Sequence, residues 1–222
     1  WAQPCKTMAR RNTRELILAT SLDLFNALGE PNVTTNQIAN EADISPGNLY
    51  YHFRSKDDIV IELFKRFLAR LQPLVDVPDD VLMSTEDLWL QLHMGFEIKG
   101  EYRFLYRNLA DLTARIPNLD RAMRGLLARE RQAALNSLNG LEQAGLLQIE
   151  GFEKELLAES ILLSITYWIP YAALQDPASF DDGSAQILAI ARVLLLVAPY
   201  LDEPEKSQLT SIAHQYLSKL YV

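Results

Sequence analysis

The side chains with the most specific chemistry lie between residues 45 and 56. Asn48, Tyr50, Tyr51 and His52 are spaced to form the outer surface of one short helix, and Lys56 follows at the start of the next. Backbone N–H groups in the first turn of a helix have no intrahelical acceptor, so they bind anions such as phosphate. Amide, phenol, imidazole and ammonium groups beside such a helix end indicate contact with a nucleic acid, although a polar helix surface is often only solvated.

Two short helices are needed to position these side chains. Thr34 is predicted to cap the first helix with Gln37 as its capping-box partner, and Ser45 is predicted to cap the second, with Pro46 in its first turn. The apolar residues recur at helical spacing: Ile38, Ala39 and Ala42 in the first helix, Leu49 and Phe53 in the second. The segment is therefore predicted to be a helix-turn-helix.

The turn and the next helix fit the same prediction. Asp43 stands in the turn, where the backbone is expected to be left-handed, and Asp is one of the few residues besides Gly that tolerate this conformation. Ser55 is predicted to cap a third helix, with Asp58 at the capping-box position and Lys56 able to reach a phosphate near the helix start. Because caps, turn and apolar spacing agree, a merely solvated surface is the weaker interpretation.

This stretch resembles the DNA-binding domain of the TetR-type bacterial transcriptional repressors. The matching residues are Thr34, Ile38, Ala39, Ala42, Gly47, Leu49, Tyr50, His52, Phe53, Ser55 and Lys56. The family usually has Gly where this chain has Asp43, so we expect the turn to form with slight strain. A second segment, YRFLYRNLADL at residues 102–112, resembles the body of one branch of the family.

The resemblance implies a role for the surface residues and a partner for them. Phosphate contacts are implied for Thr34, Tyr50, His52 and Lys56, and base-edge or sugar contacts for Thr35, Asn36, Pro46, Asn48 and Tyr51. Ser45 and Gly47 complete the expected DNA-binding surface, because they form the N-terminal turn of the recognition helix. The implied partner is a palindromic double-stranded DNA operator, bound by a homodimer.

The distribution of charge limits where DNA can bind. The formal net charge is −8 over 222 residues, which would argue against nucleic-acid binding if it were evenly spread. Residues 1–56 instead carry a balance of +1, which leaves −9 for the rest of the chain. An acidic remainder repels the duplex, so we expect DNA contact to be confined to the N-terminal part and nonspecific affinity to be modest.

The chain as a whole is predicted to be all-α, because no segment alternates with a period of two for long enough to form a strand. Residues 1–8 are expected to be a leader or disordered arm, 9–56 the helix-turn-helix domain, and 75–222 a larger helical body for effector binding and dimerisation. A long helix from Lys56 to about residue 74 connects the two domains. Further helices are predicted over residues 13–29, 84–100, 101–115, 118–145, 153–174 and 185–201.

Two late helices, residues 153–174 and 185–201, are apolar on nearly every face. Such helices are either central core or bury a second face against another copy of the chain. TetR-like proteins pair in the second way, so the resemblance also implies a homodimer. The predicted interface residues are Leu156, Leu163, Trp168, Ile187, Ile190, Leu194 and Val197.

Aromatic side chains gather in the predicted body. Trp89, His93 and Phe96 recur at i, i+4 and i+7, which places them on one helix face. An apolar cavity with a few polar groups is typical of small-molecule sites, whereas the alternative is ordinary core. The predicted ligand-binding residues are Trp89, His93, Phe96, Tyr106, Trp168 and Tyr171, for a small apolar or aromatic effector.

Catalysis has little support from the residue types present. The chain has one cysteine, its three histidines lack metal-ligand spacing, and there is no Gly-rich phosphate loop, so no catalytic residue, metal site or cofactor is expected. The longest apolar run, residues 187–198, is too short to span a bilayer, and we expect a cytoplasmic, nucleoid-associated protein with no membrane partner.

These observations predict a dimeric repressor that a small molecule releases from its operator. Two alternatives from the same class are a ligand-independent regulator and an activating one. A third alternative is an enzyme with a vestigial DNA-binding head, which would require a polar, acid-lined cleft.

Overall fold

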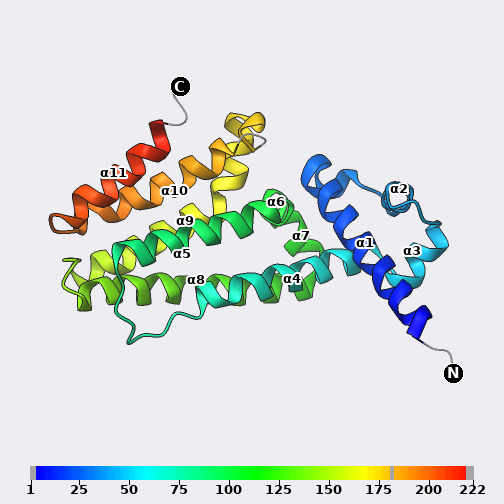
Figure 1. Ribbon diagram of the computed structural model, residues 1–222, viewed down its shortest axis with the longest axis horizontal. Coiled ribbons are helices and arrows are strands. Elements are labelled where there is room, and N and C mark those ends of the chain that lie inside the picture. Colours follow the sequence, from blue (N-terminus) through cyan, green and yellow to red (C-terminus); the bar gives the residue numbers. More distant parts are fainter. Residues whose placement is uncertain (1–3, 181–182, 219–222) are drawn as a thin grey trace. The chain divides into compact units, whose positions relative to one another are not determined.

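The computed structural model describes residues 4–180 and 183–218, and the side chains of residues 13–176, 178–180 and 183–218. In chain order the helices are α1 (Pro4–Leu28), η1 (Glu30–Asn32), α2 (Thr35–Glu41), α3 (Pro46–His52), α4 (Lys56–Val75), α5 (Thr85–Glu101), α6 (Arg103–Arg107), α7 (Leu109–Arg115), α8 (Pro117–Gln143), α9 (Gly151–Gln175), η2 (Pro177–Phe180), α10 (Ser184–Val197), η3 (Ala198–Tyr200) and α11 (Glu205–Ser218) (Figure 1). Within these residues, one antiparallel bridge between Leu147 and Leu201 is the only β-structure. The predicted all-α class is confirmed.

Three boundaries differ from the predicted ones. Of the expected leader at residues 1–8, residues 1–3 lie outside the described range, and α1 already begins at Pro4 rather than at Thr13. Met, Ala, Lys and Arg dominate this stretch and are strong helix formers, which accounts for the earlier start. The helix predicted over residues 101–115 is divided into α6 and α7 at Asn108. The structure also contains a helix that the sequence did not predict, α11, whose buried residues are Leu209 and Ala213.

The chain folds into two compact units. Among the described residues, the head unit comprises residues 4–68 and 102–120, and the body unit comprises residues 69–101, 121–180 and 183–218. This packing boundary differs from the predicted domain boundary near residue 74, because residues 102–120 pack with the N-terminal helices. The Phe104 ring lies 5.2 Å from the Phe25 ring, between centroids, and the Tyr106 ring lies 5.9 Å from that of Phe67.

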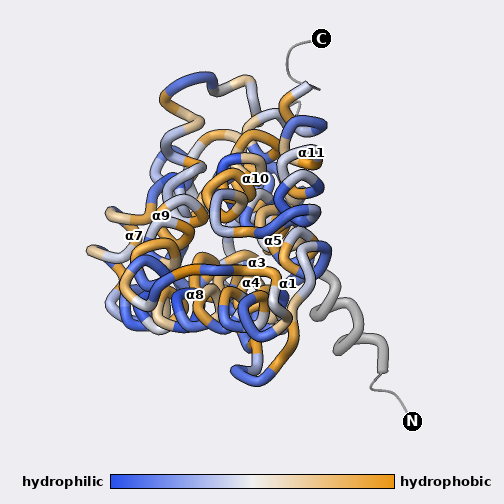
Figure 2. Tube along the Cα trace, turned by 90° about the vertical axis from the view of Figure 1, so that its left-hand side faces the viewer, coloured by the Kyte–Doolittle hydropathy of each residue, from blue (hydrophilic) through white to orange (hydrophobic). Residues whose placement is uncertain are grey.

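The body unit is built around α10. This helix packs against α5, α9 and α11, which lie beside it in Figure 1, and its hydrophobic colouring stands out in Figure 2. Contact on several sides explains why a helix whose only polar residues are Ser184, Gln186 and Arg192 is stable here. The loop before α5 approaches α8 so closely at Gly140 that an added Cβ would lie 2.5 Å from the Val81 carbonyl oxygen.

Candidate DNA-binding surface and ligand pocket

The predicted caps of α2 and α3 are both formed. Gln37 N–H donates to Thr34 Oγ1 at 3.2 Å, and Thr34 N–H donates back to Gln37 Oε1 at 2.8 Å, which completes the capping box. At the start of α3, Asn48 N–H donates to Ser45 Oγ at 3.2 Å. Each cap supplies an acceptor for an N–H group that the helix leaves unpaired, so the two helix starts are held by residues next to them in sequence.

The turn and the third cap also match the prediction. Asp43 has φ 52°, the left-handed conformation expected at this turn. Ser55 N–H donates to Asp58 Oδ2 at 3.1 Å, and Asp58 N–H donates to Ser55 Oγ at the same distance. The helix-turn-helix geometry therefore follows from local hydrogen bonds and one strained residue.

The predicted DNA-binding residues lie together on the outer side of α2 and α3. The hydroxyl groups of Thr35 and Tyr50 lie 2.9 Å apart, so the start of α2 is tied to α3. The exposed members are Thr34, Asn36, Ser45, Pro46, Gly47, Asn48, Tyr50 and Tyr51. His52 is half-buried, with its ring centroid 5.3 Å from that of Tyr51 in an edge-to-face arrangement, and Thr35 is half-buried. We call this set of residues the DNA-binding surface; the individual DNA contacts stay predictions.

Lys56 requires a correction. Its ammonium was expected to be available for a phosphate, but Nζ donates to the Glu30 carbonyl at 2.8 Å and to the Val33 carbonyl at 2.9 Å. It also pairs with Glu30 Oε1 at 3.0 Å. An ammonium group has three donors, and three acceptors within the head unit already surround this one. A phosphate contact by Lys56 would have to compete with them.

Glu30 is a residue that sequence reasoning missed. Its side chain is 0% exposed, and Oε1 pairs with both Lys56 Nζ and Arg115, whose guanidinium lies 2.8 Å away. Arg115 also reaches Asp57 at 3.0 Å. The pKa of Arg115 is raised: burial opposes this, but the hydrogen bond and charge of Glu30 and the charge of Asp57 outweigh it. No sequence signal marks Glu30, because its partners lie far along the chain.

Arg14 belongs to a basic cluster in the N-terminal half of α1, together with Arg10 and Arg11. It pairs with Glu62 at 3.1 Å, and its guanidinium lies 5.0 Å from the centre of the Phe53 ring. The residue therefore helps to hold α1 against α4 and the end of α3. Arg10 and Arg11 lie outside the residues whose side chains are described.

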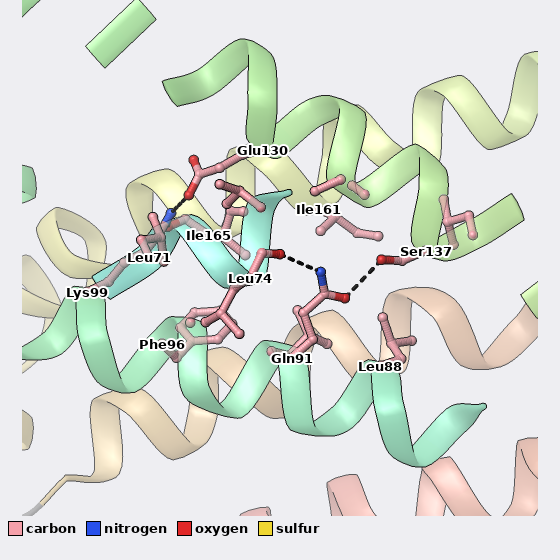
Figure 3. A pocket seen from close by; sticks show the side chains of 16 residues that line it. Leu71, Leu74, Leu88, Gln91, Phe96, Lys99, Glu130, Ser137, Ile161 and Ile165 are labelled. Carbon is pink, nitrogen blue, oxygen red and sulfur yellow. Dashed lines mark hydrogen bonds and ion pairs between the residues drawn. The ribbon is translucent and has the colours of Figure 1, made fainter. Parts of the chain in front are cut away.

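The body unit contains a narrow pocket, which we call the body pocket. It encloses about 70 Å³ and is lined by residues of α4, α5, α8 and α9 (Figure 3). Aliphatic side chains form most of the wall. Lys99 and Glu130 lie at one side, with Lys99 Nζ 2.7 Å from Glu130 Oε1, and Gln91 lies further along. Gln91 Nε2 donates to the Leu74 carbonyl at 2.8 Å and its Oε1 accepts from Ser137 at 2.9 Å.

Of the six predicted ligand-binding residues, only Phe96 lines the body pocket. Ligand binding by the six residues stays a prediction. Trp89 and His93 contact α11 instead: Trp89 Nε1 donates to the Tyr216 hydroxyl at 3.0 Å, which lies 3.1 Å from His93 Nδ1. Tyr216 lies on α11, a helix that the sequence pattern does not predict, so this partner was not expected. Tyr106 belongs to the core of the head unit.

The two remaining members lie on α9. Trp168 is buried and packs edge-on against Phe96, with ring centres 5.5 Å apart. Tyr171 is exposed, under the Arg192 guanidinium at 5.0 Å. Neither side chain reaches the body pocket, whose polar groups come from α5 and α8 instead.

The predicted dimer residues divide into two groups. Leu156 and Leu163 on α9 are 58% and 63% exposed, and Ile187 is half-buried. Trp168, Ile190, Leu194 and Val197 are buried within their own chain. Ile190, Leu194 and Val197 lie on α10, which packs against α5, α9 and α11, and Trp168 lies on α9 against Phe96. These buried side chains offer a partner little surface, and the dimer interface itself stays a prediction.

The comparisons with known proteins decide the family. Residues 17–63 match the family described as bacterial regulatory proteins of the tetR family, and residues 66–209 match TetR, described as a bacterial transcriptional repressor. The chain belongs to the TetR family. The matched ranges together include the DNA-binding surface and the body pocket, so this TetR-family chain is a transcriptional regulator with a helix-turn-helix.

Individual relatives agree with this assignment. A TetR-family transcriptional regulator from Marinobacter aquaeolei VT8 is 32% identical, with a TM-score of 0.82 over 91% of this chain and 98% of that one. The transcriptional repressor KstR2 of Mycolicibacterium smegmatis is 27% identical over 111 residues, 48% of this chain and 54% of the relative. The match thus spans about half the length of that curated relative. SmeT in complex with triclosan has the same fold, with a TM-score of 0.59 and 20% identity over 87% of this chain and 93% of that one.

These relatives are transcriptional regulators and not enzymes. In the part of the chain that the structure describes, no group of three His, Cys, Asp or Glu residues is placed to hold a metal ion.

Proposed function

We propose that this TetR-family regulator is a homodimeric repressor that binds a palindromic operator and leaves it when a small apolar effector binds the body unit. The observation that carries the DNA part is the DNA-binding surface. Asn48 and Tyr51 are exposed on α3 beside the capped helix start, where a side chain can reach base edges in a major groove while backbone N–H groups face phosphate.

An exposed apolar stripe on α9 supports a homodimer. Leu156, Leu163, Tyr167 and Leu174 are all exposed and recur close to the spacing of one helix face. We call these four residues the α9 stripe. By length and composition α9 is apolar enough to cross a membrane, yet its other side packs within the body unit. A second copy of the chain is the occupant proposed for the stripe, because a closed dimer buries the same patch on both copies.

The body pocket supports an effector. Its aliphatic wall with few polar groups is typical of small-molecule sites, but about 70 Å³ is well below the roughly 300–1,000 Å³ of a drug-sized pocket. An effector of that size must move the wall outward. Leu71, Leu74 and Val75 form part of the wall and belong to α4, the helix that begins at Lys56 in the head unit.

Effector binding then weakens DNA binding if the effector binds the conformation with the widened body pocket more tightly than the other conformation. A ligand lowers DNA affinity by the ratio of its affinities for the two conformations, and α4 is the element through which the head would respond. Triclosan, which is bound in the SmeT complex, indicates that a protein of this fold accepts a compact apolar aromatic molecule. We accordingly propose an apolar or aromatic effector for this chain.

The experiment that tests the proposal begins with the purified protein and a random duplex library. We expect selection to yield a palindrome, bound by two copies of the chain. Apolar compounds, with triclosan among them, are then titrated into the complex while DNA release is followed by fluorescence anisotropy. A nonpalindromic selected site, or one copy per site, contradicts the dimeric repressor. Tighter DNA binding on addition of effector would favour the activating alternative.

The proposed DNA partner predicts where in the cell the protein acts. A regulator that acts on operator DNA works where the chromosome is, so we place this protein in the cytoplasm with the nucleoid. A ligand-independent regulator is the second candidate, and the small volume of the body pocket is the observation that favours it.

A further inference from the structure

The Lys99–Glu130 pair is an unusual feature of the body pocket. Both side chains are almost completely buried, at 2% and 3% exposure, in a wall that is otherwise mostly aliphatic. Lys99 Nζ pairs with Glu130 Oε1 and also donates to the Ile165 carbonyl at 3.0 Å. Burying two charges destabilises a fold unless geometry and hydrogen bonds compensate for the lost hydration. The ion pair therefore stabilises the fold less than a wall made only of aliphatic side chains would.

The compensation is incomplete on one atom. Glu130 Oε2 is buried and accepts no hydrogen bond in the structure. An ionised carboxylate oxygen that is cut off from water is a strong acceptor, and leaving it unpaired costs more than leaving a neutral group unpaired. A hydrogen-bond donor delivered into the pocket beside Glu130 would remove this cost.

The ionisable residues that line the pocket limit which ligands can supply this hydrogen-bond donor. Of the 16 residues that line the pocket in the described part of the chain, only Lys99 and Glu130 are ionisable, and they neutralise each other. A ligand with a carboxylate or an ammonium group would add a third buried charge without a counter-ion. A neutral donor such as a hydroxyl group adds none.

The length of the pocket limits the rest of the ligand. Lys99 and Gln91 lie two turns apart on α5, about 12 Å along the helix axis. Figure 3 shows aliphatic side chains and Phe96 between these two polar positions. Gln91 already bonds to Leu74 and Ser137, so its end of the pocket does not require a polar group from the ligand.

We propose that the body pocket selects neutral, elongated, apolar molecules with a hydroxyl group at one end, which donates to Glu130 Oε2. This inference rests on the proposed function, in that the pocket is taken to be the effector site. It adds the chemical class of the effector. Lys99 would hold Glu130 in place through Oε1 and leave Oε2 for the ligand.

Four biphenyls that differ in one substituent test the proposal: 4-hydroxybiphenyl, 4-methoxybiphenyl, biphenyl-4-carboxylate and 4-(aminomethyl)biphenyl. Their Kd values are measured by calorimetry on the full chain without DNA. We expect the hydroxyl compound to bind about tenfold or more tightly than the methoxy compound, which keeps the oxygen but carries a methyl group in place of the donor hydrogen. The two charged compounds are expected to bind more weakly than the methoxy compound.

A charge-neutral double variant identifies the pair as the cause. Lys99→Met with Glu130→Met removes both charges and keeps an apolar wall, a change that is often neutral or stabilising for the fold. In this variant the hydroxyl and methoxy compounds should bind about equally. The matched control, Arg131→Gln with Glu155→Gln, removes an exposed pair in the same unit and should keep the wild-type preference.

The results that overturn this inference differ from the results that would contradict the proposed function. Equal binding of the hydroxyl and methoxy compounds to the wild type overturns the inference, as does tighter binding of either charged compound or no binding of all four. A double variant that keeps the preference also overturns it. If that variant fails to fold, the order of the four Kd values in the wild type decides alone. Failure of DNA release despite tight binding would instead contradict the proposed repressor.

Discussion

Glu30 Oε1 lies 3.0 Å from Lys56 Nζ, and the Glu30 side chain is completely buried. The same oxygen accepts from Arg115 on α7 at 2.8 Å. One carboxylate thus joins η1 to the first residue of α4 and to Arg115 of α7. A change at Glu30 should therefore affect the head unit more than its place in a three-residue 3-10 helix would indicate.

Replacing Glu30 by Ala should destabilise the head by about 3 kcal/mol, because it leaves two cations without their shared buried counter-ion. Urea unfolding at pH 7 measures the change. Glu15→Ala is the matched control, since Glu15 pairs with Arg66 at the surface, and it should cost less than about 1 kcal/mol. Equal effects of the two changes would contradict the role assigned to Glu30.

Changes on the DNA-binding surface should separate specificity from general affinity. Asn48→Ala removes an exposed amide at the start of α3 and should reduce discrimination between the selected operator and single-base variants by about 1–3 kcal/mol. Its stability should stay close to that of the wild type, because Asn48 is exposed. An unchanged preference among operators would place Asn48 away from the bases.

Lys56→Ala should weaken binding to every sequence. If Lys56 also reaches a phosphate, the slope of log K against log salt falls by about one unit. If its role is only to bond Glu30 and Val33, the melting temperature falls and the slope is unchanged. Measuring both quantities on the same variant distinguishes the two roles.

The α9 stripe should carry the dimer. Leu163→Glu places a charge on the exposed stripe and should yield folded monomers in sedimentation at micromolar concentration, since desolvating an unpaired charge costs several kcal/mol. Leu82→Glu, at an exposed leucine outside α9, should leave the dimer intact. Leu194→Glu should instead unfold the body, because Leu194 is completely buried in its own chain. A wild-type monomer would contradict the interface.

Two glycines of α8 should respond oppositely to the same substitution. At Gly140 a new Cβ would lie 2.5 Å from the Val81 carbonyl and 2.9 Å from Met83 Cβ, so Gly140→Ala should cost about 1–3 kcal/mol despite the helix propensity of Ala. At Gly125 nothing lies within 4 Å, and Gly125→Ala should gain about 0.5–1 kcal/mol. Urea unfolding of both variants checks the pair.

The hydrogen-bonded cap at the start of α5 should make the free energy of unfolding depend on pH. Hydrogen bonds from the Ser84 side chain and backbone lower the pKa of Asp87 below its ordinary value of 3.8. A carboxyl group whose pKa is lower in the folded state stabilises the fold above its unfolded pKa, and this contribution is lost as pH falls through the folded value. The difference in unfolding free energy between wild type and Asp87→Asn should therefore shrink as pH falls below about 3.8. A difference that is constant with pH would contradict the cap.

The local signals in the sequence were sufficient for the helix-turn-helix. Thr34 with Gln37, Ser45 with Asn48 and Ser55 with Asp58 are each three residues apart, and Asp43 adopts its left-handed conformation within one turn. Such bonds depend only on neighbouring residues, so pattern and spacing predict them. The all-α class followed for the same reason, because helical periodicity is also local.

The tertiary structure alone decided which side chains meet across long stretches of chain. Arg115 reaches Glu30 across 85 positions, and Tyr216 reaches Trp89 across 127. The second contact joins Trp89, an expected ligand-binding residue, to α11. The same helix packs against α10 and helps to bury the residues of α10 that were expected to face a partner. The body pocket combines side chains from four helices, among them the Lys99–Glu130 pair. Periodicity says which face of a helix is apolar, whereas the neighbour that covers that face depends on how the helices pack.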